Sequence, residues 1–128
     1  MWLYICIALG GAAGSVSRHF LSTVMTDRLG SAFPYGTLSV NVIGSLLIGV
    51  FFYLSSSSGR FEMSDNMKQL LIAGFCGGFT TFSAFSLQTL LLIKENAWLR
   101  AGAYVTSSVA LCMLFVWLGF LICRKMSL

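Results

Sequence analysis

Two sets of polar residues recur at helical spacing inside apolar parts of the sequence. Each set has three members, four positions apart: Thr37, Asn41 and Ser45 in the first, and Tyr104, Ser108 and Cys112 in the second. Residues four positions apart lie on one face of a helix, so each set would form a line of hydroxyl, amide and thiol groups. Because neither set includes a carboxylate, these hydrogen-bond donors suit an anion better than a cation. Such residues also form hydrogen bonds between packed helices, and that interpretation stays open.

The segment 74–86, Gly-Phe-Cys-Gly-Gly-Phe-Thr-Thr-Phe-Ser-Ala-Phe-Ser, is a second feature that could bind an ion. Three glycines within five residues, each costing about 1 kcal/mol relative to alanine in a helix, are followed at once by the turn-prone cluster Thr-Thr-Phe-Ser, so we expect the helix to break here. Inside a membrane, unwound backbone is tolerated only where protein or a polar cavity supplies its hydrogen-bond partners. The break therefore predicts an ion site made from backbone groups. A glycine-rich packing seam between helices is the alternative.

Aromatic and basic residues give two further candidates. Phe82 and Phe85 are three positions apart and share one side if the chain is helical there, although lipid-facing rings are an equally good interpretation. Arg18 lies inside the first apolar stretch, where an ionisable residue is a functional candidate. A basic side chain near a helix end can instead extend its charge to the headgroups.

The composition sets the environment in which these residues act. Of 128 residues, 57% are hydrophobic and 9% are charged, whereas a soluble domain has about 25% charged residues. Since a spanning helix needs about 20 apolar residues, we predict an all-α integral membrane protein with one domain, 1–128, and four transmembrane helices at about 2–25, 36–54, 68–93 and 98–123. The third helix is expected to be broken. The eight basic residues are scattered, which favours membrane-interface anchors over nucleic-acid binding.

The basic residues are divided almost equally between the two ends of such a bundle. On the side of both termini we expect Arg60, Lys68, Arg124 and Lys125. On the other side we expect Arg28, Lys94 and Arg100, with Arg18 leaning the same way. An excess of Lys and Arg normally sets the orientation of a membrane protein. So small a bias predicts dual topology, in which copies insert both ways round and pair as an antiparallel homodimer.

Three motifs resemble those of the CrcB (Fluc) family of small bacterial fluoride channels. They are the segments 10–18 (Gly-Gly-Ala-Ala-Gly-Ser-Val-Ser-Arg), 36–45 (Gly-Thr-Leu-Ser-Val-Asn-Val-Ile-Gly-Ser) and 74–86. The resemblance covers essentially the whole chain in length, helix number and motif order. It implies a fluoride-selective passive ion channel in the bacterial inner membrane, which exports fluoride and lowers its cytoplasmic concentration. It also implies an antiparallel homodimer in the lipid bilayer, with a structural sodium ion at the dimer centre.

The resemblance assigns roles to single residues as well. It places the sodium ion on the backbone carbonyls of Gly77 and Thr80. It assigns the fluoride pathway to six side chains: Asn41, Phe82, Phe85, Tyr104, Ser108 and Arg18. Two positions depart from the family pattern, because Gln88 stands where a glutamate is usual and Cys112 where a serine is common. A thiol is a weaker hydrogen-bond donor than a hydroxyl.

Three other functions compete with that of a channel. A small dual-topology multidrug exporter shares the length and the charge balance, but it needs an intramembrane carboxylate, and the predicted spans contain no Asp or Glu. A haem-carrying membrane anchor normally needs two axial ligands, and His19 is the only histidine. An enzyme is excluded, because the sequence has no phosphate-binding loop, metal cluster or acid–base pair.

Overall fold

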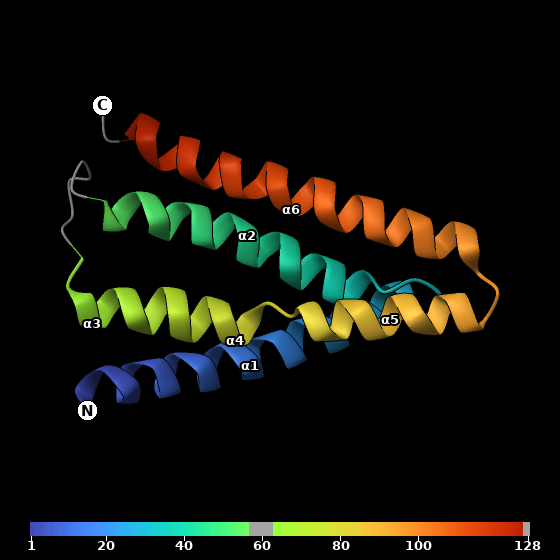
Figure 1. The fold of residues 1–128 in the computed structure, drawn as a ribbon, viewed down its shortest axis with the longest axis horizontal. Coiled ribbons are helices and arrows are strands. Elements are labelled where there is room, and N and C mark those ends of the chain that lie inside the picture. Colours follow the sequence, from blue (N-terminus) through green and yellow to red (C-terminus); the bar gives the residue numbers. More distant parts are fainter. Residues whose placement is uncertain (57–62, 127–128) are drawn as a thin grey trace.

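The computed structural model describes residues 1–56 and 63–126. Arg60, one of the basic residues expected on the side of both termini, lies outside the described residues. All regular elements in the described ranges are helical: α1 (Trp2–Leu29), α2 (Tyr35–Ser55), α3 (Asp65–Lys68), η1 (Gln69–Cys76), α4 (Gly77–Phe79), α5 (Phe82–Lys94) and α6 (Trp98–Met126). These elements form four rods along the chain, the third of which consists of α3, η1, α4 and α5 (Figure 1). The all-helical prediction is therefore confirmed.

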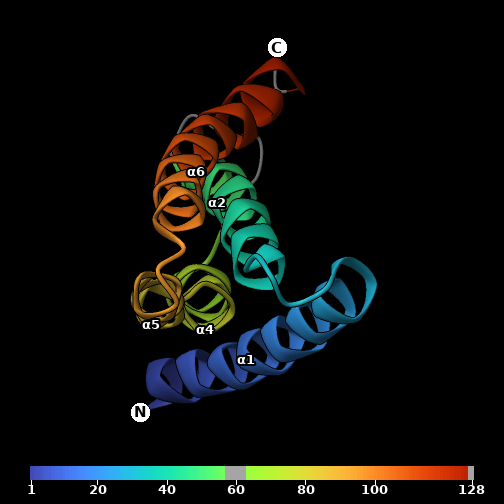
Figure 2. The same ribbon diagram turned by 90° about the vertical axis from the view of Figure 1, so that its right-hand side faces the viewer.

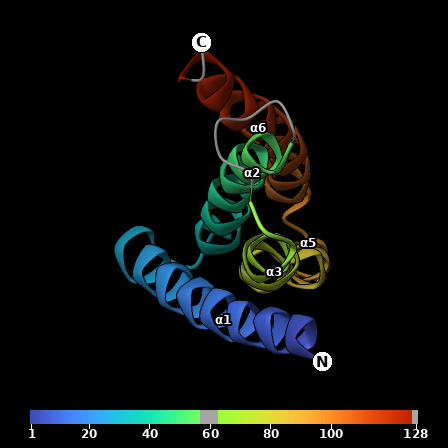
Figure 3. The same ribbon diagram turned by 90° about the vertical axis from the view of Figure 1, so that its left-hand side faces the viewer.

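Successive rods run in opposite directions. In Figure 1, α1 begins and α6 ends at the same end of the molecule, while the connections from α1 to α2 and from α5 to α6 lie at the opposite end. Seen along the rods, α2 lies between α6 and the third rod, and α1 crosses on the outer side of η1 and α4 (Figures 2 and 3). This arrangement places α2, α5 and α6 around one region, which contains the candidate site.

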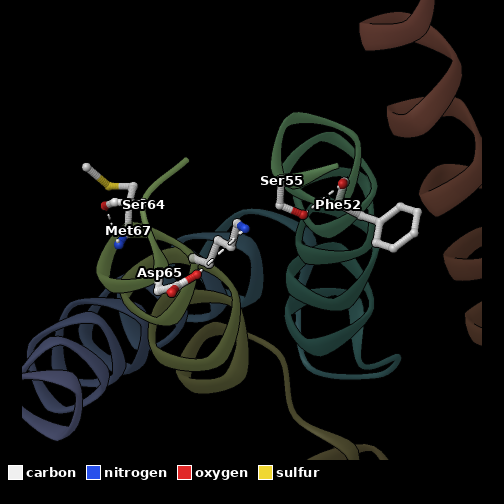
Figure 4. Close-up of polar contacts among 6 residues, drawn as sticks. Phe52, Ser55, Ser64, Asp65 and Met67 are labelled. Carbon is white, nitrogen blue, oxygen red and sulfur yellow. Dashed lines mark hydrogen bonds and ion pairs between the residues drawn. The ribbon is translucent and has the colours of Figure 1, made fainter. Parts of the chain in front are cut away.

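The helix ends differ from the predicted ones for local reasons. α1 continues past residue 25 to Leu29 and ends at Gly30, whose positive φ of 83° is a conformation that glycine adopts readily. The third rod begins at Asp65 rather than at 68, because the Ser64 hydroxyl caps it by accepting the Met67 amide at 3.4 Å. Figure 4 shows this cap, together with the last turn of α2, where the Ser55 hydroxyl donates to the Phe52 carbonyl at 2.8 Å.

Three of the rods are long and apolar enough to cross a membrane: Tyr35–Ser55, Asp65–Lys94 and Trp98–Met126. The first rod, α1, is as long as these but carries four polar or charged residues in its middle: Ser15, Ser17, Arg18 and His19. The prediction of four spans is therefore supported for three of them. Large apolar side chains are exposed along the rods, among them Phe52 at 62% and Trp117 at 58%. A surface of this kind suits lipid or another chain.

Gly74 and Gly78 of the third rod pack against α1, and Gly77, where a Cβ would meet no atom within 4 Å, is helical as well. A Cβ at Gly10 would overlap the Leu70 carbonyl oxygen, and one at Gly78 would overlap the Gly11 carbonyl oxygen. The helix breaks within the predicted segment 74–86, at Thr80 and Thr81 of its turn-prone cluster, and the alternative of a packing seam describes Gly74 and Gly78. Close contact between the two helices offsets the low helix propensity of glycine.

Candidate functional site

The third rod breaks at two threonines. Thr80 and Thr81 have extended backbone angles, with φ and ψ of −80° and 156° and of −152° and 117°, between the end of α4 at Phe79 and the start of α5 at Phe82. The break therefore lies within the predicted segment 74–86 but on the C-terminal side of the glycines. An extended pair inside a helix removes hydrogen bonds from several backbone groups, which need other partners.

Asn41 on α2 supplies two of these partners. Its Nδ2 donates to the Thr81 carbonyl at 3.2 Å, and its Oδ1 accepts the Thr81 amide at 2.8 Å. Its own backbone carbonyl accepts the Ser45 hydroxyl at 2.7 Å. The Asn41 side chain thus forms hydrogen bonds with both the carbonyl and the amide of Thr81, and its second Nδ2 hydrogen remains for another acceptor.

Two backbone carbonyls next to the break lose their usual donors. In an unbroken helix, the Thr81 amide would bond the Gly77 carbonyl, but here it donates to Asn41. Likewise, the Ala84 amide, the helical partner of the Thr80 carbonyl, donates to Thr81 Oγ1 at 3.2 Å. A Cβ at Gly77 would meet no atom within 4 Å. Carbonyl oxygens that have lost their hydrogen-bond partners in this way are suitable ligands for a sodium ion.

A groove of about 380 Å³ lies beside the break, between α2, α5 and α6. Four of the six side chains assigned to the fluoride pathway line it: Asn41, Phe82, Phe85 and Ser108. Its other polar residues are Ser45, Thr80, Thr81 and Cys112. Phe82, which lines the groove, is 79% exposed. The groove is therefore open to the outside of the single chain at this residue.

Ser108 has the one groove hydroxyl among the described residues that lacks a hydrogen-bond partner. The Ser45 hydroxyl donates to Asn41 O, and the Thr80 hydroxyl donates to Cys76 O at 2.8 Å. The Thr81 hydroxyl lies 3.2 Å from Ser83 Oγ. By contrast, Ser108 is only 5% exposed, and its Oγ has no partner in the part of the chain that the structure describes. A buried, unpaired hydroxyl costs about 1–3 kcal/mol, so it indicates a missing ligand.

Aromatic rings form one wall of the groove. The ring centroids of Phe82 and Phe85 are 5.3 Å apart, and those of Phe85 and Tyr104 are 5.2 Å apart. Tyr104 is fully buried behind Phe85, and its hydroxyl donates to Gln88 Oε1 at 2.9 Å. Tyr104 thus supports the wall from behind and is not among the residues that line the groove.

Arg18 is the one remaining residue of the predicted pathway. It is half-buried on α1, the helix that packs against η1 and α4, and it does not line the groove. Thr81 and Gln88, which hold the break and Tyr104 in place, had no predicted role of their own. The N-cap preference of threonine before an apolar helix is a signal that could have located Thr81 at the start of α5. Nothing in the sequence pairs Gln88 with Tyr104.

Comparison with known proteins gives consistent matches over nearly the whole chain. Residues 5–120 match the family described as CrcB-like protein, Camphor Resistance (CrcB). The fluoride-specific ion channel FluC of Opitutus terrae is 50% identical over 119 residues, which are 93% of this chain and 90% of that protein. The fluoride-specific ion channel FluC of Paramagnetospirillum magneticum is 48% identical over 119 residues, 93% of each chain. At this identity and coverage, the chain belongs to the CrcB (FluC) family of fluoride-specific ion channels.

Proposed function

We propose that this protein is a fluoride-selective passive ion channel that exports fluoride and lowers its cytoplasmic concentration. The observation that carries the proposal is the buried Ser108 hydroxyl, which has a free hydrogen and faces a groove without carboxylates. The spare Nδ2 hydrogen of Asn41 is a second donor at the same groove. The relatives from Opitutus terrae and Paramagnetospirillum magneticum, which bear the name fluoride-specific ion channel, support the choice of anion.

The physical chemistry of fluoride explains this set of residues. Fluoride is small and strongly hydrated, so a pathway must replace its water with closely directed donors. The hydroxyl and amide donors do this from one side, and the rings of Phe82 and Phe85 complete the wall with their electropositive edges. Larger halides are excluded because the path is narrow. No step of conduction consumes a proton or a cofactor, so the protein acts as a channel and not as an enzyme.

The complete pathway requires a second, inverted copy. The open side of the groove at Phe82 needs a cover, and the exposed apolar faces of the rods need lipid or protein. Among the described residues, three basic ones belong to α3 and the end of α6, at one end of the molecule, and three to the end of α1, the end of α5 and the start of α6, at the other (Figure 1); they are Lys68, Arg124 and Lys125, and Arg28, Lys94 and Arg100. This balance favours insertion of the four rods, α1 included, in both orientations in the bacterial inner membrane. Arg18 then adds positive potential near the pathway and attracts the anion.

A structural sodium ion fits the freed carbonyls of Gly77 and Thr80. Each copy contributes these two oxygens, and two breaks that meet on a two-fold axis offer four. The bound cation would compensate the partial negative charges of the oxygens and hold the two breaks together. The open face at Gly77 leaves room for the approach of the partner.

Ion efflux from proteoliposomes tests the proposal. Vesicles loaded with equal fluoride and chloride should release fluoride rapidly through the purified protein and retain chloride, as followed with ion-selective electrodes. Equal release of both anions would contradict fluoride selectivity. The alternative function, a small dual-topology multidrug exporter, predicts instead that a proton gradient drives uptake of a cationic dye.

A further inference from the structure

We propose that an anionic phospholipid binds in a second groove, between the C-terminal parts of α2 and α6, and places its phosphate at Arg124. This second groove (the apolar groove) has a volume of about 410 Å³. Its lining residues are all apolar: Ile48, Gly49, Phe52, Val116, Trp117 and Phe120. It shares only Ile48 with the groove at Ser108, so lipid binding there is a property separate from the proposed fluoride conduction.

Small residues bring α2 and α6 into close contact beside the apolar groove. A Cβ at Gly49 would overlap the Val116 carbonyl oxygen, and one at Gly119 would overlap the Leu46 carbonyl oxygen. The two helix backbones therefore approach closely at this level, as small residues allow inside a membrane. The contact leaves a hollow between the larger side chains that flank it.

Three aromatic rings border the apolar groove and leave it accessible. The ring centroids of Phe52 and Phe120 are 6.3 Å apart, and those of Trp117 and Phe120 are 5.8 Å apart. Phe52 and Trp117 are exposed on the surface of the single chain. Because α2 and α6 are both long and apolar enough to cross a membrane, this hollow lies at the level of the lipid acyl chains. A flexible acyl chain suits it, since every lining residue is apolar.

Arg124 lies in line with the apolar groove on α6. Val116, Phe120 and Arg124 follow one another at intervals of four residues, which places them on one face of the helix. Arg124 lies about 6 Å beyond Phe120 along the helix axis, towards the end of the span. A phospholipid has the same order, with an anionic phosphate at the membrane surface and acyl chains further inside. The guanidinium group binds a phosphate through two parallel hydrogen bonds.

The charge at this end of the molecule favours an anionic lipid over a second copy of the chain. Arg124 and Lys125 are exposed, and neither takes part in the one ion pair that the described residues form. Each end of the molecule has three basic described residues and fewer acidic ones, which are Asp65 at one end and Asp27 and Glu95 at the other (Figure 1). A copy in either orientation would therefore bring net positive charge to Arg124. An anionic headgroup brings the opposite charge.

Fluorescence quenching by brominated lipids tests the site in the full-length protein. Trp2 and Trp98 are exposed and lie outside the apolar groove, so Trp2→Phe combined with Trp98→Phe leaves Trp117 as the only tryptophan. This protein is reconstituted in phosphatidylcholine vesicles that contain a small fraction of either phosphatidylglycerol with brominated acyl chains or phosphatidylcholine with the same chains. Half-maximal quenching of Trp117 should need about five-fold less of the brominated phosphatidylglycerol, because one basic residue near the surface attracts an anionic lipid to this degree. Equal quenching by the two lipids would overturn the proposal.

Two charge-neutralising variants of this single-tryptophan protein distinguish a lipid in the apolar groove from general attraction. Arg124→Gln should abolish the preference for phosphatidylglycerol. Lys125→Gln is the matched control and should retain most of it, since Lys125 is turned about 100° around the helix from Arg124. An unchanged preference in Arg124→Gln, or an equal loss in both variants, would overturn the site. Protection of Trp117 from both brominated lipids would also overturn it, because a second copy would then cover the apolar groove.

Discussion

At the scale of single residues, the ability of the groove to bind an anion depends on which polar hydrogens are already used in hydrogen bonds within the chain. The groove hydroxyls of Ser45 and Thr80 donate to backbone carbonyls nearby, and the side chain of Asn41 is largely occupied by Thr81. The Ser108 hydroxyl has no such acceptor among the described residues. The number of polar side chains at a site therefore overstates its capacity to bind an anion, and Ser108 becomes the principal donor.

Substitution Ser108→Ala should lower fluoride efflux about ten-fold or more, because a hydrogen bond to a charged group contributes about 1.5–3 kcal/mol. Thermal stability should not fall, since the change removes a buried hydroxyl without a partner. The matched control is Ser107→Ala, whose hydroxyl donates to the Tyr104 carbonyl at 3.3 Å outside the groove. Efflux assays on both variants, beside melting curves, measure these effects. Equal efflux by Ser108→Ala and wild type would remove Ser108 from the pathway.

Substitution Asn41→Asp should also reduce fluoride efflux steeply while the dimer persists. A carboxylate can still accept the Thr81 amide, but it cannot donate to the Thr81 carbonyl and has no hydrogen for the anion. Its negative charge repels fluoride as well. The control Asn66→Asp makes the same chemical change on the exposed surface of α3. Efflux together with cross-linking of the two variants checks the prediction, and retained efflux in Asn41→Asp would contradict it.

At the scale of elements, helix packing and the helix break are produced by different residues. Gly74 and Gly78 allow α1 to pack closely against η1 and α4, and Thr80 and Thr81 interrupt the rod, beginning two residues after Gly78. The Ser15 hydroxyl adds a donor to the Gly78 carbonyl at 3.4 Å across this seam. η1 is a π-helix, a local form that is often found near functional sites. The contact of α1 with η1 and α4 holds the N-terminal half of the third rod in place, immediately before the break.

Substitution Gly14→Ala should destabilise the protein by about 1–3 kcal/mol, because the new methyl group would overlap the Phe75 carbonyl oxygen and force α1 away from the third rod. Gly102→Ala is the matched control, since a Cβ there would meet no atom within 4 Å. Thermal unfolding in detergent should show a lower melting temperature for the first variant only. Equal melting temperatures would show that the seam tolerates the extra volume.

At the scale of the whole molecule, the single chain has two open surfaces near the break. The groove between α2, α5 and α6 is open at Phe82, and Gly77 on α4 has an open face. The buried core of the chain is small. These features support a partner copy that closes the groove and approaches the break, as the proposed antiparallel dimer requires.

Substitution Gly77→Ala should leave the single chain folded but weaken the dimer. The backbone at Gly77 is helical, with φ −63° and ψ −39°, and a Cβ meets nothing within the chain, so alanine is acceptable there. In the dimer, the same methyl group would obstruct the partner and the sodium ion. Size-exclusion chromatography in detergent should show a larger monomer fraction. Purification of the wild type with a large organic cation in place of sodium should impair efflux in the same way.

The sequence by itself determined the helical architecture, the family and the segment that contains the break. These follow from properties that are local to the chain, namely apolar length, the spacing of polar residues and the motifs. Gln88 and Thr81 show the limit of such reasoning, because their partners Tyr104 and Asn41 lie 16 and 40 residues away in the sequence.

Only the tertiary structure decided which groups remain free. Glycine has a low intrinsic helix propensity, yet Gly74 and Gly78 are helical where they pack against α1, and the break lies at Thr80 and Thr81. Hydrogen bonds are likewise assigned by proximity in space, so the sequence could not tell that Asn41 is mostly occupied while Ser108 is unpaired. Residue types indicate what a site can bind, whereas the packing of the helices decides which donors are available for it.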